Sequence, residues 1–321
     1  MRSPACMSVA VRRPDGTIIV QEGQLRTRLA KEWIWKIPAV RGVATLVESF
    51  TLGYRALRFS AEQQMTEEEA AAQSSGSGFG GNMIFLISIV AALAIFKGLP
   101  QLLATGASWL TGTDLAMQDW RYHLVTGAFQ LVVLVSYLAL IGRVKEIRRV
   151  FQYHGAEHKT ISAYEQGLPL TVENVRKQTT LHPRCGTTFL VIVVLVSIAV
   201  GSIAAPILLP NAEGITGWAM IFGLRLALLP AIAAVSYELQ RLGARYCTTG
   251  PLRVFLWPGF LFQKITTREP DDAQIEIAIA AMQSARWREE VKDQAPEPAE
   301  PRVFPDLARL LDAFAVARPA A

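Results

Sequence analysis

Residues 187–209 read TTFLVIVVLVSIAVGSIAAPILL, an apolar run without a single charged side chain. A run of about 20 apolar residues is what a helix needs to cross the hydrocarbon core of a bilayer. Three further stretches of similar length and character lie at 82–103, 122–142 and 215–237. The sequence therefore predicts a mainly α protein, a polytopic membrane helical bundle with about four transmembrane helices.

The composition of the whole chain supports this class. Of the 321 residues, 51% are hydrophobic and only 18% are charged, which is more apolar than an ordinary soluble domain. The net charge of +5 favours basic cytoplasmic loops, and no basic stripe with interleaved aromatic residues indicates nucleic-acid binding. Three widely spaced cysteines form no disulfide framework, which suits a reducing compartment. We expect membrane lipids and no nucleic acid as partners.

The first 61 residues are expected to form a cytoplasmic unit, a small β-hairpin followed by an amphipathic helix. Apolar residues alternate over 6–22 on either side of the turn sequence RPDG at 13–16. Over 38–60 they recur at helical spacing, which predicts a helix in the membrane interface or packed on the bundle. Residues 62–81 are acidic and then rich in Gly and Ser, as in a flexible linker.

The membrane domain is expected to cover 82–264. Its last segment, 251–264, is apolar but too short to span, which favours an interfacial or re-entrant piece. A cytoplasmic helix with an aspartate cap is predicted over 265–290. Residues 291–321 read as a Pro-rich tail that we expect to be weakly ordered.

The distribution of Lys and Arg predicts the orientation of the spans. The loop 143–186 carries eight of them, the loop 104–121 carries one, and the loop 210–214 carries none. Because basic loops stay on the cytoplasmic side, the loop 143–186 and both termini are predicted to be cytoplasmic. The expected location is the bacterial inner (plasma) membrane, with multiple passes.

Three of the four histidines lie in the loop 143–186. His154 and His158 belong to the sequence HGAEH, which matches H-x-x-E-H, the inverted form of the zincin motif. Four residues apart on a helix, both imidazoles project from one face and can reach one metal ion. In this interpretation the histidines hold a divalent metal, zinc in particular, and Glu157 acts as general base on a water molecule.

Further candidate ligands follow in the sequence HPRCG. If His182 and Cys185 both joined the first two histidines, the site would be closed and structural, whereas one alone would leave a position open for catalysis. Glu238, at the inner end of the fourth span, is a further candidate ligand or positioning partner. Arg184 is expected to contact an anionic substrate or lipid headgroups. In the alternative interpretation the histidines only bond to loops, and Cys185 is a small buried residue.

Charged residues inside the spans are few. Arg225 lies within the fourth span, and an intramembrane charge indicates function unless the side chain snorkels to the outer interface. Lys97 lies near the end of the first span, and His123 is expected at the outer membrane surface. Two charges are too few for the ion or substrate path of a transporter.

Several long motifs carry a resemblance to a known family. They are VAVRRPDG at 9–16, RGV and VES within 41–49, YHGAEHK at 153–159, LHPRCGT at 181–187 and ITTREP at 265–270. Over roughly residues 1–285 the chain resembles the YqhQ-like family, bacterial membrane proteins of unknown function described as predicted metal-dependent enzymes. The resemblance implies a metal and a reaction but no substrate. Members usually carry a Gly-rich stretch before the segment that resembles Met1–Pro4; this chain lacks it, so we expect its true start to lie upstream of Met1.

Two classes of function remain open at this point. The leading one is a metal-dependent membrane enzyme, a hydrolase in particular, acting on a lipid-linked or peptide substrate at the cytoplasmic face. The alternative is a non-enzymatic membrane scaffold or partner-binding protein with a structural metal or none. The number of protein ligands discriminates them, because four argue for a structural site and three plus water for a catalytic one.

Overall fold

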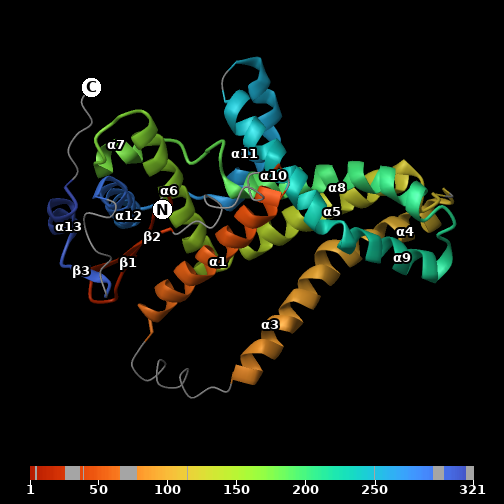
Figure 1. Cartoon of the computed structure of the whole chain (residues 1–321), viewed down its shortest axis with the longest axis horizontal. Coiled ribbons are helices and arrows are strands. Elements are labelled where there is room, and N and C mark those ends of the chain that lie inside the picture. Colours follow the sequence, from red (N-terminus) through yellow and green to blue (C-terminus); the bar gives the residue numbers. More distant parts are fainter. Residues whose placement is uncertain are drawn as a thin grey trace.

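The computed structural model describes residues 1–3, 6–25, 37–38, 40–65, 78–113, 115–248, 250–291 and 300–315. Within these ranges the chain is mainly helical. A small sheet with its covering helices forms one end of the molecule, and a bundle of apolar helices forms the other (Figure 1).

The sheet begins with the predicted hairpin, which is confirmed. Strands β1 (Cys6–Arg12) and β2 (Ile18–Gln24) pair antiparallel, with Cys6 opposite Gln24. Gly16 in the turn has φ 89°, a conformation that glycine adopts without steric cost. Strand β3 (Arg302–Phe304) adds to β2 and completes the order β1-β2-β3.

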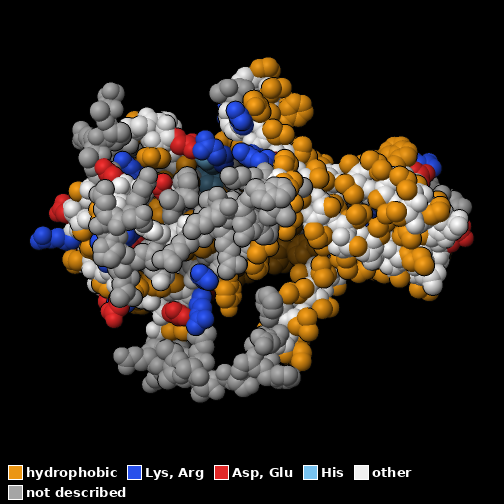
Figure 2. All heavy atoms as spheres, in the orientation of Figure 1, with side chains coloured by type: hydrophobic (Ala, Val, Ile, Leu, Met, Phe, Trp, Pro, Cys, Tyr) orange, Lys and Arg blue, Asp and Glu red, His pale blue; other side chains and the backbone are white. Residues whose placement is uncertain are grey.

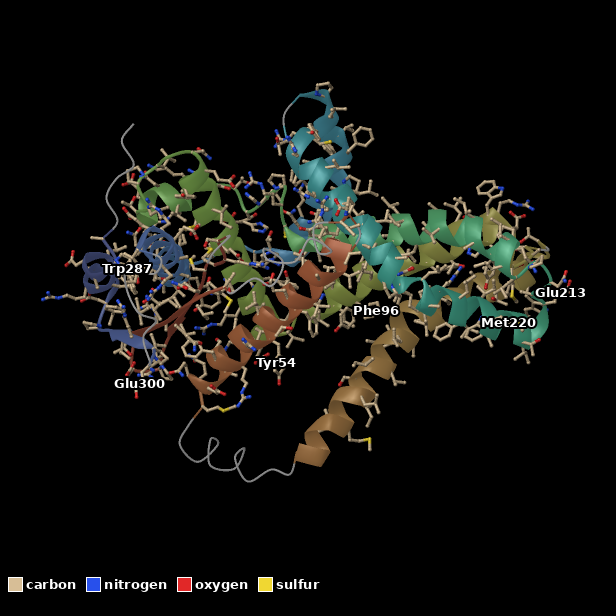
Figure 3. The ribbon with its side chains drawn as sticks, viewed as in Figure 1. Tyr54, Phe96, Glu213, Met220, Trp287 and Glu300 are labelled. Atoms are coloured by element: carbon tan, nitrogen blue, oxygen red, sulfur yellow. The ribbon has the colours of Figure 1, made fainter. Side chains whose placement is uncertain are left out.

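The C-terminal segment therefore differs from the weakly ordered tail expected from its composition. After β3, helix α13 (Leu307–Ala313) places Leu310 in a buried cluster with residues of β2 and α12. Phe314 is fully buried there and packs edge-on against Trp287, with ring centroids 5.2 Å apart (Figure 3). Apolar burial of this kind overrides the low local propensity of a Pro-rich sequence.

Helix α12 (Asp272–Val291) organises this end of the molecule. One face packs on the sheet, and the other packs on α6 (Lys145–Glu165) and α7 (Val172–Arg176). Fully buried residues on the second side include Ala156, Val175 and Ile279. Because α6 carries HGAEH, this packing fixes the helix on which two of the predicted ligands lie.

The bundle contains three helical stretches long and apolar enough to cross a membrane: Leu86–Thr111, Trp120–Ile141 and Gly186–Leu208. The second is α5 (Trp120–Ile141) and the third is α8 (Gly186–Leu208), close to the predicted bounds. The fourth consists of α9 (Gly214–Ala227) and α10 (Leu229–Tyr246), which meet at 47°. The described chain thus has three such stretches, or four if the bent pair is one span.

Two of these stretches are less regular than their composition predicts. The first comprises α3 (Gly78–Leu93), a π-helical turn η3 (Ala94–Gly98) and α4 (Leu99–Thr111), and so continues well past the predicted end. Helix α3 diverges from the bundle below η3 (Figure 1). Between α9 and α10 the chain bends just before Pro230, whose missing N–H cannot continue the hydrogen bonding of α9. Residues 78–81, expected within the linker, are already helical, and 66–77 lie outside the described residues.

Two amphipathic elements flank the bundle. Helix α1 (Val40–Glu62) packs on α10 at Gly42, and its apolar residues Val47, Phe50 and Tyr54 are exposed (Figure 3). The segment after α10 forms a 3-10 turn η4 (Pro251–Leu256) and helix α11 (Trp257–Thr266), which packs against α8. Hydrophobic side chains cover much of the visible surface of α3 and the bundle (Figure 2).

Candidate metal centre

Helix α6 presents HGAEH next to the segment that follows α11. A Cβ added to Gly155 would lie 2.1 Å from the carbonyl oxygen of Arg268, so only glycine allows this approach. The N–H of Arg268 donates to the carbonyl of Phe151 at 2.9 Å and joins the two segments. A turn at 142–144 separates helix α6 from α5, so α6 is not a rigid extension of that span. Its position comes from α12 and from this contact instead.

Backbone carbonyls fix the protonation of both histidines of the motif. The Nδ1 of His154 lies 2.9 Å from the carbonyl oxygen of Thr266, and the Nδ1 of His158 bonds to the carbonyl of Thr180. A carbonyl can only accept, so each Nδ1 must carry the proton. The Nε2 atoms therefore face the group: in a neutral ring Nε2 offers a lone pair to a metal ion, as in common metal-binding histidines, and in a protonated ring it donates to a thiolate in the metal-free protein.

Cys185 completes a compact group with these two histidines. It is the N-cap of α8, and its Sγ lies 3.3 Å from Nε2 of His154. One ligand atom from each of His154, His158 and Cys185 lies within 4.8 Å of the others, the single group of this kind in the described ranges. Two imidazole nitrogens and one thiolate are a donor set that suits zinc. These three residues could therefore hold a metal ion.

The electrostatics of the group favour a thiolate. Burial raises the pKa of the Cys185 thiol, but hydrogen bonds and charge from His154 and His158 outweigh burial and lower it to about 5. Burial lowers the pKa of His154, whereas contact with Cys185 raises it, with a net increase. The start of α8 adds a partial positive charge beside the sulfur. Cys185 is thus a buried cysteine in the ionisation state that metal binding requires.

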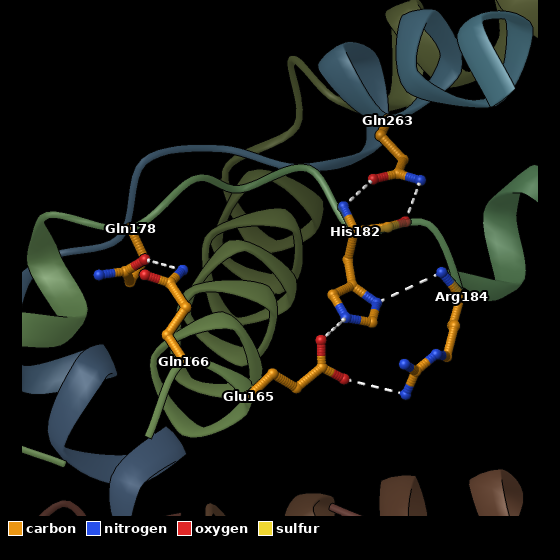
Figure 4. A network of polar contacts seen from close by, with 6 residues as sticks. All are labelled: Glu165, Gln166, Gln178, His182, Arg184 and Gln263. Carbon is orange, nitrogen blue, oxygen red and sulfur yellow. Dashed lines mark hydrogen bonds and ion pairs between the residues drawn. The ribbon is translucent and has the colours of Figure 1, made fainter. Parts of the chain in front are cut away.

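His182 lies beside this group but is engaged elsewhere. Its ring is 5.7 Å from that of His158, centroid to centroid. Nδ1 accepts from the N–H of Arg184 at 3.3 Å, and Nε2 lies 3.3 Å from a carboxylate oxygen of Glu165 (Figure 4). Burial lowers the pKa of His182, against the opposing effect of Glu165. Both ring nitrogens therefore have partners, and His182 supplies no ligand atom to the group.

The loop that carries His182 is held by a buried amide. Gln263 of α11 accepts from the N–H of His182 and donates to its carbonyl, both at 2.8 Å (Figure 4). It also donates to the hydroxyl of Thr188 at 3.0 Å. Gln240 of α10 donates to the carbonyl of Cys185 at 2.9 Å. Side chains from two other helices thus position the short turn between His182 and α8.

Of the remaining predicted site residues, some line the cavity beside the histidines and one does not. Glu157 and Arg184 line the same cavity as the histidines, and Arg184 donates to Glu165 at 2.9 Å. Glu238 instead forms a two-point ion pair with Arg41 of α1, including Nε to Oε1 at 2.7 Å, and does not line that cavity. The structure therefore brings His154, His158, Cys185 and Glu157 together and engages Glu238 with a different helix.

A cavity of about 880 Å³ opens in front of the histidine–cysteine group. Its far wall comes from α12 and from the first residues of the chain. The lining is amphiphilic, with apolar, acidic and basic side chains: Met1, Arg2, Ser3, His154, Glu157, His158, Ile161, Tyr164, Glu165, His182, Arg184, Cys185, Gly186, Met282, Ala285, Arg286, Glu289 and Glu290. The group of three candidate ligands is thus accessible to a molecule of ligand size.

Sequence reasoning missed three kinds of contribution to this site. The carbonyls of Thr180 and Thr266 are backbone groups, and their side chains give no signal for them. Gln263 is polar within an apolar stretch, a signal that could have indicated a buried hydrogen-bonding role. Residues of α12 such as Arg286 reach the cavity only through tertiary packing. The ITTREP motif marked the segment of Thr266 without indicating its role.

Comparison with known proteins assigns the chain to a family. The model of a family described as "Protein of unknown function (DUF1385)" matches residues 37–287. The "Uncharacterized protein YqhQ" of Bacillus subtilis (strain 168) is 31% identical over 299 residues, which cover 90% of each chain. No solved structure matches the chain. On the family match and this near full-length identity, the protein belongs to the DUF1385 family, to which the YqhQ-like resemblance of its motifs pointed.

Proposed function

We propose that this protein is a metal-dependent enzyme of the bacterial inner membrane, a hydrolase in particular, whose site opens at the cytoplasmic face. The observation that carries the proposal is the group of His154, His158 and Cys185, with ligand atoms within 4.8 Å of one another at the wall of the large cavity. Three protein ligands and an open side are typical of catalytic zinc sites. A fourth protein ligand, typical of a structural site, is not supplied by His182, whose ring nitrogens are engaged.

In the proposed mechanism the protein orients and moves protons around the bound ion. The carbonyls of Thr266 and Thr180 would hold the imidazoles with Nε2 facing the ion. A divalent metal bound there would supply Lewis acidity. Glu157 borders the same cavity, so its carboxylate is the proposed acceptor for a proton from the attacking water. Arg184 would orient an anionic part of the substrate at the rim.

The shape and lining of the cavity support an amphiphilic substrate. Ile161, Tyr164 and Met282 offer apolar contacts, while Arg184 and Arg286 offer positive charge. Cys185 begins α8, the longest uninterrupted apolar helix of the described bundle, so the site would lie at the membrane surface. The concentration of Lys and Arg in 143–186 supports a cytoplasmic orientation. A lipid-linked or peptide substrate fits this position.

Hydrolysis by the metal-loaded protein tests this proposal. Detergent-purified protein would be loaded with Zn²⁺ and assayed against chromogenic esters, phosphodiesters and peptides, beside Glu157→Gln and a chelator-treated sample. We expect turnover that the chelator abolishes, and a Glu157→Gln variant that keeps its metal but loses about 100-fold or more in rate. Metal bound without turnover of any probe, and without an effect of Glu157→Gln, would favour the scaffold with a structural metal.

A further inference from the structure

A second polar cluster lies inside the bundle, lined by residues of η3, α5, α8 and α9; Figure 1 shows α5, α8 and α9 side by side there. It encloses a cavity of about 20 Å³, lined among others by Lys97, His123, Ser197 and Arg225. A volume of this size admits about one water-sized species and no organic molecule. This cluster shares no residue with the candidate metal centre and does not depend on the proposed enzyme activity.

Arg225 is held inside the bundle by neutral partners. Its Nη2 lies 2.9 Å from Nδ1 of His123, and its Nη1 donates to Oε1 of Gln101 at 3.4 Å. The guanidinium also lies over the ring of Tyr122, 5.8 Å from its centroid. Arg225 is thus held by side chains of α4 and α5, and snorkelling to the outer interface stays a prediction. None of these partners carries a negative charge.

Among the described residues, no counter-charge balances the two cations that border this cavity. In the ranges that the structure describes, no carboxylate lies within ion-pairing distance of Lys97 or Arg225. Asp119, at the start of α5, is held by Arg121 with Nε to Oδ2 at 2.8 Å. A charge taken out of water is costly unless an opposite charge accompanies it. An anion in the cavity would provide that compensation.

The histidine of this cluster is fixed as a hydrogen-bond donor. A guanidinium has no acceptor, so Nδ1 of His123 must accept from Arg225, and the ring proton is on Nε2. His123 is only 2% exposed; its Nδ1 edge faces Arg225 and Gly201, both of which line the cavity, and the backbone carbonyl of Met117 lies near enough to interact with the ring. The buried hydroxyl oxygen of Ser197 has no hydrogen-bond partner among the described residues. Ser197 lines the cavity, and a buried hydroxyl without a partner is costly.

The backbone near Lys97 provides a separate indication. Lys97 lies in the π-helical turn η3, which interrupts an otherwise α-helical stretch. Such turns insert an extra residue and occur frequently at functional sites. In this chain the interruption coincides with the lysine that borders the cavity.

We propose that this cavity binds a small monovalent anion of the halide class. The charges of Lys97 and Arg225 attract it, and the hydroxyl of Ser197 donates a hydrogen bond to it. Metal cations are disfavoured by the two positive side chains, and larger anions by the small volume. The anion would hold η3, α5, α8 and α9 together at a point where no carboxylate of the described residues does.

Bromide binding to the detergent-purified full chain tests this inference. The thermal unfolding midpoint would be titrated with sodium bromide against sodium gluconate at constant ionic strength, and the linewidth of the bromide NMR signal would report binding directly. We expect a saturable rise of the midpoint and line broadening in the wild type. Lys97→Met, which keeps the bulk of the side chain, should weaken the apparent affinity at least about tenfold.

Arg121→Gln is the matched control, because it removes a positive charge at the same end of α5 but outside the cavity. It should respond to bromide like the wild type. Ser197→Ala leaves all charges in place and should weaken binding severalfold, which guards against a Lys97 variant that fails to fold. Equal midpoints in bromide and gluconate without line broadening would overturn the proposal. So would unchanged bromide affinity in a folded Lys97→Met or Ser197→Ala variant.

Discussion

The two histidine clusters of this protein differ in which ring nitrogen carries the proton. At the candidate metal centre, backbone carbonyls accept from Nδ1 of His154 and His158, so each Nε2 presents a lone pair. In the bundle, Arg225 donates to Nδ1 of His123, so Nε2 presents an N–H. The partner of one ring nitrogen thus decides whether the other can face a cation or an anion. At the first site the imidazoles are therefore candidate metal ligands, whereas in the bundle the imidazole holds the guanidinium of Arg225.

The clusters also differ in access. The first borders a cavity of about 880 Å³, whereas the second encloses about 20 Å³. A large cavity can admit a substrate, while a site of one-ion size can only stabilise the helices around it. This contrast is why we assign chemistry to the first cluster and ion binding to the second.

The largest expected effect is a crossed loss of ligand responses. Zn²⁺ should raise the unfolding midpoint of Lys97→Met as it does that of the wild type, but not that of His158→Ala. Bromide should stabilise His158→Ala but not Lys97→Met. A ligand at 100 times its Kd stabilises the folded state by about 2.7 kcal/mol, so each loss is measurable by a thermal scan. If one variant lost both responses while remaining folded, the two clusters would not be independent.

The next effect concerns the thiol of Cys185 in metal-free protein. With a pKa of about 5 instead of 9.0, the thiolate persists from pH 8 down to pH 6. An ordinary thiol loses about 100-fold in alkylation rate over that interval, whereas Cys185 should lose less than about twofold. The measurement is iodoacetamide labelling followed by mass spectrometry of the peptide that contains Cys185.

Cys6 serves as the internal reference for that experiment. It is also buried, but burial raises its pKa, so it should label slowly at pH 6. The lowered pKa of Cys185 also predicts that its contribution to stability is present at high pH and lost as the pH falls through about 5. Labelling of Cys185 that rises tenfold per pH unit from 6 to 8 would show that the histidines do not stabilise the thiolate.

A smaller effect is expected from packing next to the ligands. Gly155→Ala would place a methyl group 2.1 Å from the carbonyl oxygen of Arg268, and overpacking of this kind costs about 1–3 kcal/mol or more. The shift would also move Thr266 away from His154 and weaken metal binding. Gly186→Ala is the control, because its Cβ would meet nothing within 4 Å. Equal unfolding midpoints for the two variants would contradict the close approach of α6 to this segment.

The smallest effect concerns the amide that holds the His182 turn. Gln263→Leu leaves the buried N–H of His182 without a partner, at a cost of about 1–3 kcal/mol, and leaves its carbonyl with only the N–H of Cys185. Gln166→Leu removes an exposed contact with Gln178 and should change the midpoint little (Figure 4). We expect Gln263→Leu also to lower zinc affinity, because Cys185 follows this turn. A stable Gln263→Leu variant with unchanged affinity would remove Gln263 from the account of the site.

The sequence predicted those features that depend on local patterns. The alternation of apolar residues around RPDG predicted the hairpin, and the apolar runs predicted the bounds of α5 and α8 to within a few residues. The spacing of His154 and His158 predicted their shared face, and their rings lie 4.4 Å apart. These signals are readable because each depends on residues close together in the chain.

The other features arise from contacts between distant segments. Strand β3 pairs with β2 across nearly 280 residues, so a Pro-rich composition gave the wrong expectation for the tail. Glu238 was a candidate ligand because the sequence placed it at the inner end of the fourth span, near the histidine loop, but it forms an ion pair with Arg41 of α1. The burial of His123 beside Arg225 was likewise not predicted from the sequence. Side-chain partners of this kind depend on how helices pack, which spacing along one helix does not reveal.

Metal content by elemental mass spectrometry tests the central claim most directly. Wild-type protein reconstituted with Zn²⁺ would be compared with Cys185→Ser, His158→Ala and His182→Gln after removal of free metal. The account predicts about one metal ion per chain in the wild type and in His182→Gln. For Cys185→Ser and His158→Ala it predicts a loss of metal affinity that exceeds the ~100-fold weakening typical of residues that only orient ligands. A wild type without metal, or folded Cys185→Ser and His158→Ala variants that bind as tightly as the wild type, would contradict it.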